Sequence, residues 1–156
     1  MVASEGGPLE STLAKVGGRH IAMPLKAKTP WGIWKNARRL TTAIRAHGVS
    51  LVHARSRAPA WSAWLACRRT GVPFVTTYHG TYSENFPFKR LYNSVMARGE
   101  VVIAASQFIA DLVAERHKVP AERIRVIPRG GDPAIFDPTR LSVDRQIKLR
   151  SEEHTS

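Results

Sequence analysis

The chain has 156 residues and a single cysteine, Cys67, so it cannot form an internal disulfide. One cysteine also excludes a zinc site built from several cysteines, and no dense cluster of His and Asp suggests another metal site. There is no run of about 18 apolar residues, and the first twenty residues lack the apolar segment of a signal peptide. The sequence therefore predicts a protein of a reducing cytoplasm, without a transmembrane helix or an export signal.

Three sequence motifs of common enzyme classes are also missing. No G-x-G-x-x-G follows a predicted strand, and no G-x-x-x-x-G-K-[ST] is present. The G-x-S-x-G turn that carries the nucleophile of many hydrolases is absent as well. These absences exclude the usual dinucleotide fingerprint, the phosphate-binding P-loop and the common hydrolase motif.

Acidic residues are scarce, with 12 Asp and Glu against 24 Lys and Arg, which gives a net charge of +12. Between Ser11 and Ser83 there are twelve basic residues and no acidic one. Such a positive field favours an anionic partner, which could be a nucleic acid, an acidic membrane face or a phosphorylated substrate. Charge alone does not choose among these three.

Six short apolar and β-branched runs predict strands that are buried on both faces. They are Val2–Ser4, His20–Pro24, Leu51–His53, Phe74–His79, Val101–Ala105 and Ile124–Ile127. Helical stretches separate most of these runs, and this alternation favours right-handed crossovers between parallel strands. We therefore predict an α/β fold with a doubly wound, mostly parallel sheet in a single domain.

Four helical stretches have capping residues and an apolar face. Thr29 caps the first, which opens at Pro30 and ends at Gly48. The others are expected over 59–69, over 87–98 and from 107 onward, the last capped by Ser106. The side chains expected to point inward include Ile33, Ala37, Leu40, Ile44, Leu91 and Phe108. The tryptophans at 31, 34, 61 and 64 are expected to pack in the core or between helix and sheet.

Ligands of such sheets bind beyond the carboxyl ends of the strands. His79 ends a predicted strand there, beside Gly80, and its imidazole could donate to a sugar hydroxyl or phosphate or exchange a proton. The alternative is a strand-end histidine bonded to a neighbouring loop. Arg55 suits bidentate capture of phosphate or carboxylate, or is a solvated surface arginine. Gly130 and Gly131 either let the backbone approach an anion or only turn the chain.

Several ordered motifs carry a resemblance to a known family. They are Val52–Ser56, Gly71–Gly80, Val102–Ser106, Ile124–Asp132 and Phe136–Pro138. In order and spacing, from about Val2 to Pro138, the sequence resembles the N-terminal half of family 4 glycosyltransferases. The resemblance implies a Rossmann-like half of a GT-B fold, in which two such domains face each other across a cleft.

The resemblance also implies an activity. The N-terminal domain mainly holds the acceptor and the C-terminal domain mainly holds the nucleotide-sugar donor. The expected reaction is retaining hexosyl transfer to a lipid-linked or polysaccharide acceptor, as in synthesis of lipopolysaccharide core. No metal and no cofactor is expected, because the nucleotide-sugar is a substrate. The expected location is the cytoplasm, with the protein bound peripherally to the inner face of the cytoplasmic membrane.

The resemblance places the site on the loops after the predicted strands. His79 matches the family histidine that contacts the transferred sugar and is the expected catalytic residue. The residues expected to bind substrate are Arg55, Ser56, Gly80, Thr81, Tyr82, Ser106, Arg129 and Gly130. The segment Ile127–Asp132 matches the start of the hinge into the second domain.

The family pattern divides the chain into three parts. Residues 1–138 correspond to the N-terminal domain without its first strand, and 139–150 read as the start of a linker or helix toward a C-terminal domain that is missing. Residues 151–156 resemble translated sequencing adapter, or are an ordinary frayed tail. We expect a chain truncated in this way to be inactive by itself.

The charge and the aromatic residues suggest two further partners. A basic α/β module that binds nucleic acid is the alternative function, but no strand with interleaved aromatic and basic residues and no recognition helix is evident. An anionic membrane surface is the other candidate, because the basic helix over 30–47 with Trp31 and Trp34 could lie against anionic lipid.

Overall fold

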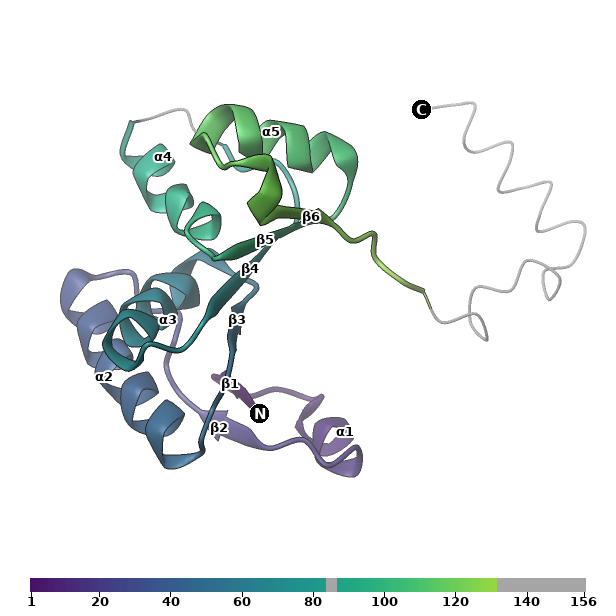
Figure 1. The fold of residues 1–156 in the computed structure, drawn as a ribbon. Coiled ribbons are helices and arrows are strands. Elements are labelled where there is room, and N and C mark those ends of the chain that lie inside the picture. The colour runs from purple at the N-terminus through teal and green to yellow at the C-terminus, as the bar shows by residue number, and fades with distance from the viewer. Residues whose placement is uncertain (84–86, 132–156) are drawn as a thin grey trace, which may run out of the picture.

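The computed structural model describes residues 1–83 and 87–131, and within them six strands alternate with five α-helices (Figure 1). The strands are β1 Val2–Ser4, β2 His20–Ala22, β3 Val52–Ala54, β4 Phe74–Tyr78, β5 Val101–Ala104 and β6 Ile124–Val126. The helices are α1 Glu10–Lys15, α2 Pro30–Ala46, α3 Arg57–Thr70, α4 Pro87–Asn93 and α5 Gln107–His117, with 3-10 turns η1 Ser94–Ala97 and η2 Ala121–Arg123. The predictions for 139–150 and 151–156 lie outside the described residues.

All strand pairs among the described residues are parallel, as predicted. They form two sheets, β1-β2 and β3-β4-β5-β6, rather than one continuous sheet. Within the described residues no backbone hydrogen bond joins β1 to β3. Each of these two strands therefore has one edge without a neighbouring strand.

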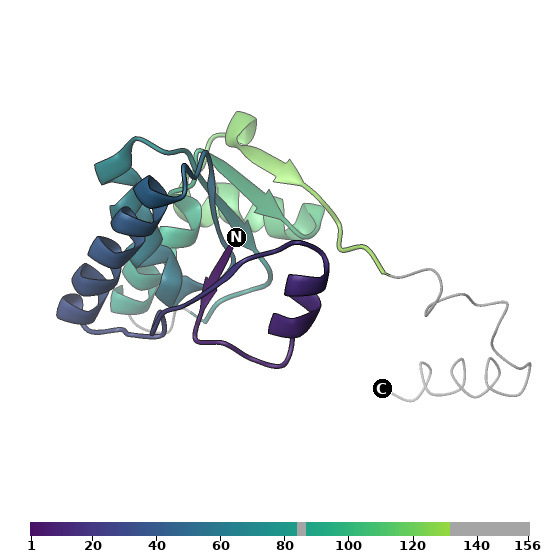
Figure 2. The ribbon, with the colours of Figure 1, turned by 90° about the horizontal axis from the view of Figure 1, so that it is seen from below.

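The helices lie on both sides of the strands, which confirms the doubly wound α/β fold. Figures 1 and 2 show α1 on one side, and α2 and α3 packed together on the other. Successive parallel strands joined by helices end at the same edge. The loops after β3, β4, β5 and β6 therefore meet at the carboxyl edge of the four-stranded sheet.

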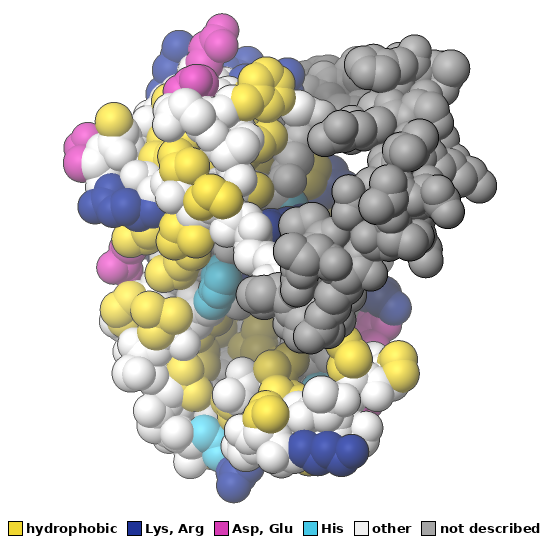
Figure 3. All heavy atoms as spheres, turned by 90° about the vertical axis from the view of Figure 1, so that its right-hand side faces the viewer, with side chains coloured by type: hydrophobic (Ala, Val, Ile, Leu, Met, Phe, Trp, Pro, Cys, Tyr) yellow, Lys and Arg dark blue, Asp and Glu magenta, His cyan; other side chains and the backbone are white. Residues whose placement is uncertain are grey.

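The main core lies between the four-stranded sheet and helices α3 and α5 together with η1. Alternate residues of β4 (Phe74, Thr76 and Tyr78) are buried on this face. The Thr76 hydroxyl donates to the Met96 carbonyl at 2.6 Å, which ties β4 to η1. The opposite face carries residues that are less covered, such as Val75 and Ile103. Figure 3 looks onto that side and shows hydrophobic side chains gathered along it.

The helix ends follow the local signals of the sequence. The Thr29 hydroxyl accepts a hydrogen bond from the Gly32 amide at 3.2 Å and caps α2. Gly48 and Gly71 follow α2 and α3 with φ angles of +58° and +73°, a left-handed conformation that favours glycine. The predicted apolar face of α2 is confirmed, because Ala37 and Ile44 are buried.

Four side chains that were expected to be inside lie on the surface instead. They are Trp31, Trp34, Leu91 and Phe108. Both tryptophans lie off the stripe of α2 that packs inward. Phe108 precedes the buried Ile109 by one residue, a step of about 100° around a helix, so it points to water. In contrast, Trp61 and Trp64 pack against the core as predicted.

The sequence did not predict α1, a six-residue helix without any buried residue. Its first residue, Glu10, accepts a hydrogen bond from the Gly7 amide at 2.8 Å and lies 3.3 Å from His20 Nδ1. His20 Nε2 in turn hydrogen-bonds the Ser4 hydroxyl at 2.9 Å. Polar contacts, rather than an apolar face, therefore hold this helix near β1 and β2.

Candidate functional site

Three predicted site residues follow different strands at the carboxyl edge. Arg55 comes directly after β3, His79 directly after β4, and Arg129 shortly after β6. The charges of both arginines act on the imidazole of His79. The fold therefore brings together side chains that are 24 and 50 residues apart in sequence.

His79 is the centre of this group. Its side chain is half-buried, and its Nδ1 atom is buried without a hydrogen-bond partner among the described residues. Desolvation lowers the pKa of His79 below its ordinary value of 6.5, and the charges of Arg55, Arg129 and His53 lower it further. The imidazole is therefore neutral near pH 7. A neutral imidazole has one donor and one acceptor nitrogen, so it can hydrogen-bond a hydroxyl group of a bound ligand.

His53 is a member of the site that the sequence prediction did not include. It lies on β3, two residues before Arg55, and its Nε2 is 2.6 Å from the Thr77 hydroxyl. Desolvation first and Arg55 second lower the pKa of His53. Side chains alternate between the two faces of a strand, so residues two positions apart point to the same side. This alternation relates His53 to Arg55 and could have indicated His53 from the sequence.

The site is positively charged. Within the described residues the ion pairs are His20 with Glu10 and Lys26 with Glu5, and neither involves Arg55 or Arg129. Guanidinium groups bind phosphate and carboxylate oxygens in pairs of parallel hydrogen bonds. The carboxyl edge is therefore suited to an anionic ligand.

Two glycines leave space beside these side chains. A Cβ atom built at Gly80 or Gly130 would meet no other atom within 4 Å. Neither residue has a positive φ angle, so the backbone conformation does not itself demand glycine. Each glycine therefore leaves its loop open to solvent next to His79 or Arg129.

The remaining predicted site residues have other surroundings. The Ser106 hydroxyl accepts from the Ile109 amide at 3.3 Å and caps α5, whereas Ser56 is exposed and makes no such bond at α3. Thr81 is exposed. The ring of Tyr82 lies 4.6 Å from that of Tyr78, and the Tyr82 hydroxyl accepts a hydrogen bond from the backbone amide of His79. Their part in substrate binding stays a prediction.

Over residues 1–83 and 87–131, no three His, Cys, Asp or Glu side chains come together to hold a metal ion. No helix in those same ranges is both long and apolar enough to cross a membrane.

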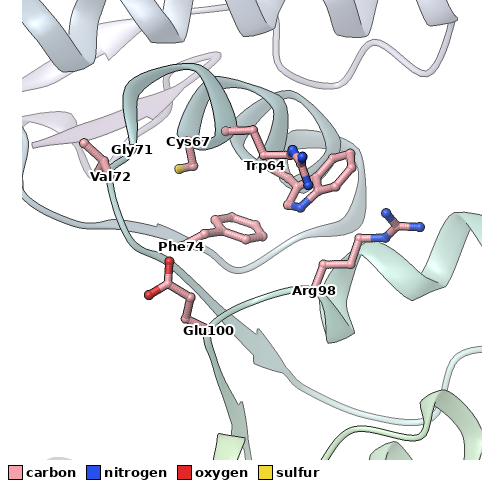
Figure 4. A pocket seen from close by; sticks show the side chains of 8 residues that line it. Trp64, Cys67, Gly71, Val72, Phe74, Arg98 and Glu100 are labelled. Carbon is pink, nitrogen blue, oxygen red and sulfur yellow. The ribbon is translucent and has the colours of Figure 1, made fainter.

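A separate pocket of about 300 Å³ lies at the opposite edge of the sheet, where β4 and β5 begin (Figure 4). Phe74 and Cys67 lie against it, with Glu100 and Arg98 at its side. Burial raises the pKa of the Cys67 thiol to about 11, and Glu100 adds to this shift, so the thiol is protonated. None of the predicted site residues lines this pocket.

Comparisons with known proteins assign the fold to a family. The model of Glycosyltransferase Family 4 matches residues 1–135. A glycosyltransferase from Rickettsia africae ESF-5 is 38% identical with a TM-score of 0.73, and the match covers 99% of this chain and 41% of that one. No curated protein sequence matches the chain.

Two more distant structures share the fold. Anabaena Alr3699/HepE, solved in complex with UDP, is 19% identical with a TM-score of 0.67 over 98% of this chain and 42% of its own. A UDP-N-acetylglucosamine 2-epimerase from Rickettsia bellii is 17% identical with a TM-score of 0.59 over 96% of this chain and 43% of its own. This chain thus spans less than half of each solved chain.

The order of the motifs and the parallel α/β fold agree with the family match over 1–135 and with the 38% identity to a solved glycosyltransferase. The chain belongs to glycosyltransferase family 4 and has the Rossmann-like fold of the N-terminal domain of a GT-B enzyme.

Proposed function

We propose that this chain is the acceptor-side half of a retaining glycosyltransferase. The enzyme moves a hexosyl group from a nucleotide-sugar to a lipid-linked or polysaccharide acceptor of the cell envelope, such as lipopolysaccharide core. Family membership supports transfer of a sugar. A UDP-sugar donor is supported by the similar fold of Alr3699/HepE, which was solved with UDP-glucose. The observation that carries the proposal is His79 at the carboxyl edge, with an unpartnered Nδ1 and with two arginines, Arg55 and Arg129, whose charges act on its imidazole.

The chemistry assigns a role to each side chain. In the transfer, the bond from the anomeric carbon to the leaving diphosphate breaks and the diphosphate takes the electron pair. The acceptor oxygen bonds to the same face of that carbon, and its proton passes to the leaving oxygen of the diphosphate. Neutral His79 holds a hydroxyl group of the transferred sugar, and Arg55 and Arg129 stabilise the negative charge of phosphate oxygens. These fixed charges act without a metal ion. We place the enzyme in the cytoplasm, on the inner face of the cytoplasmic membrane.

Replacement of His79 tests this proposal. In a polypeptide that joins this chain to a donor-binding domain, His79→Ala should lower kcat/KM for sugar transfer by about 100-fold or more, the usual contribution of a positioned polar group in the transition state. His47→Ala is the matched control, because His47 is an exposed histidine at the end of α2. Unchanged transfer by His79→Ala would remove the role given to this residue.

The net charge of +12 favours a second candidate function, a module that binds nucleic acid. That function predicts tight binding to duplex or single-stranded oligonucleotides, with an affinity that falls steeply as salt rises. Weak binding that does not depend on oligonucleotide length, at about 150 mM salt, would exclude it. A gel-shift titration at several salt concentrations measures this.

A further inference from the structure

The pocket at the amino edge of the four-stranded sheet combines an apolar interior with charged side chains around it (Figure 4). Phe74 and Cys67 line it and are only 3% and 4% exposed, whereas Glu100, Arg68 and Arg98 are exposed. Its volume of about 300 Å³ lies at the lower end of the range for small-molecule sites. The pocket is therefore suited to a ligand with one ring rather than to a nucleotide-sugar.

Two arginines gather around one tryptophan at this pocket. The guanidinium of Arg98 lies 4.7 Å from the centre of the Trp64 ring, and that of Arg68 lies 5.5 Å from it. Arg98 also lies 5.1 Å from the centre of the Trp61 ring. In the described part of the chain neither arginine belongs to an ion pair. A guanidinium stacked on an indole keeps its N–H donors free at its edge, so the two arginines are suited to an anionic group.

A carboxylate lies at the other end of the pocket. In Figure 4 Glu100 and Arg98 lie on opposite sides of the Phe74 ring. The Glu100 amide donates to the Phe74 carbonyl at 2.7 Å, which fixes Glu100 beside the start of β4. Glu100 also contributes to the raised pKa of the Cys67 thiol, so its charge acts on the pocket interior. A carboxylate accepts hydrogen bonds and repels a second negative charge, so this end is suited to a hydroxyl or amino group.

We propose that this pocket binds a small aromatic carboxylate that has a hydroxyl or amino group at the far end of its ring. The ligand carboxylate pairs with Arg68 and Arg98, its ring lies against Phe74, and its hydroxyl or amino group donates to Glu100. This inference goes beyond the proposed function, because the pocket lies at the edge opposite His79 and none of the predicted sugar-site residues lines it.

Titration with three one-ring probes tests the class of ligand. The first probe, 4-hydroxyphenylacetate, has both groups, phenylacetate lacks the hydroxyl, and tyramine has an ammonium in place of the carboxylate. In the ¹⁵N-labelled chain, 4-hydroxyphenylacetate should shift the indole N–H signal of Trp64 until it saturates, while the signals of Trp31 and Trp34 on α2 stay in place. Phenylacetate should bind about 5-fold more weakly because it lacks one hydrogen bond. Tyramine should cause no saturable shift, and Trp64→Phe assigns the signal.

Variants of the charged side chains test how the ligand is held. The double variant Arg68→Gln, Arg98→Gln should weaken binding of 4-hydroxyphenylacetate by about 10-fold or more, the usual effect of losing hydrogen bonds to a charged group. Arg38→Gln is the matched control, because Arg38 is also exposed and lies 5.0 Å from the centre of a tryptophan ring, that of Trp34 on α2. It should leave the affinity unchanged. Glu100→Ala should remove the preference for 4-hydroxyphenylacetate over phenylacetate. Circular dichroism spectra check that every variant is folded.

Five results would overturn the inference. They are saturable binding of tyramine, equal shifts of all indole signals, a double variant that binds as tightly as the control, displacement of the probe by UDP-glucose, and shifts of the Trp64 signal on dilution without any probe. The fourth result would assign the pocket to the sugar donor, and the fifth would assign it to a contact between copies of the chain. The titration needs no sugar transfer, so its failure is distinct from failure of the proposed enzyme function.

Discussion

At the scale of single residues, the protonation of His79 links the electrostatics of the site to its chemistry. Two arginines and His53 lower the pKa of a histidine that desolvation already keeps neutral. A neutral ring avoids repelling these cations and retains an acceptor nitrogen for a substrate hydroxyl group. Arg55 and Arg129 thus have two effects: they attract an anion and they set the charge of the neighbouring imidazole.

The first prediction concerns the titration of this histidine. The pKa of His79 should lie below 6.5, and Arg55→Gln should raise the pKa of both His79 and His53, because Arg55 lowers both. NMR titration of the imidazole signals, assigned with His79→Gln, measures this, and Arg45→Gln on α2 is the control. Equal pKa values before and after Arg55→Gln would contradict the electrostatic account.

The same shift makes stability depend on pH. The folded chain binds the His79 proton less readily than the unfolded chain, so the unfolded state holds more protons as pH falls through 6.5. The free energy of unfolding should therefore decrease on the acid side of 6.5, and His79→Gln should reduce that decrease. Urea unfolding at a series of pH values tests the sign.

A second prediction follows from the close packing around Gly99. A Cβ atom there would lie 2.6 Å from the Val101 carbonyl oxygen and 2.9 Å from the Thr76 hydroxyl, which is bonded to the Met96 carbonyl. Gly99→Ala should lower the free energy of unfolding by about 1–3 kcal/mol, the usual cost of overpacking. Gly80→Ala is the matched control, because its Cβ would meet nothing within 4 Å. Similar urea midpoints for the two variants would show that a side chain at position 99 does not disturb the packing and would contradict the prediction.

At the scale of elements, two serines occupy the same position and differ in one hydrogen bond. Ser106 precedes α5 and caps it, while Ser56 precedes α3 and makes no side-chain cap. Ser106→Ala should lower the free energy of unfolding by about 1 kcal/mol, and Ser56→Ala should have a smaller effect. Ser106→Thr keeps the capping hydroxyl and should restore stability. If Ser106→Ala leaves the free energy of unfolding unchanged, the capping hydrogen bond does not stabilise the fold. The predicted contact with substrate would then explain the serine better than the cap does.

The elements also show which features the sequence could predict. The helix ends could be predicted because capping involves only residues within one turn of the helix end. Local residue type was sufficient at Thr29, Gly48 and Gly71. The exposure of Phe108 depends on which side of α5 meets η1 and the sheet, and neighbouring residues in sequence do not contain that information. Strand alternation could have pointed to His53, but its contact with Thr77 exists only once β3 and β4 are paired.

At the scale of the whole molecule, the two sheets leave surfaces that parallel sheets normally cover. β1 and β3 each have one edge without a strand neighbour among the described residues. On one face of β4 and β5, Val75 and Ile103 are only half-buried. Parallel sheets in α/β proteins are usually covered on both faces, and open strand edges pair with other chains. The described part of the chain therefore exposes surfaces that further protein could cover.

The last prediction is that the 156-residue chain by itself binds a hydrophobic dye and self-associates, and that it does not transfer sugar. Open edges and a half-covered apolar face cause the first two effects. The third is expected because the donor is proposed to bind another domain, and the chain spans about 41% of the Rickettsia africae enzyme. Dye fluorescence, light scattering and transfer from UDP-glucose measure the three properties.

Joining the chain to a donor-binding domain should produce transfer and lower dye binding. A monomeric chain that transfers sugar alone would show that these surfaces need no cover and that the donor site lies within residues 1–156.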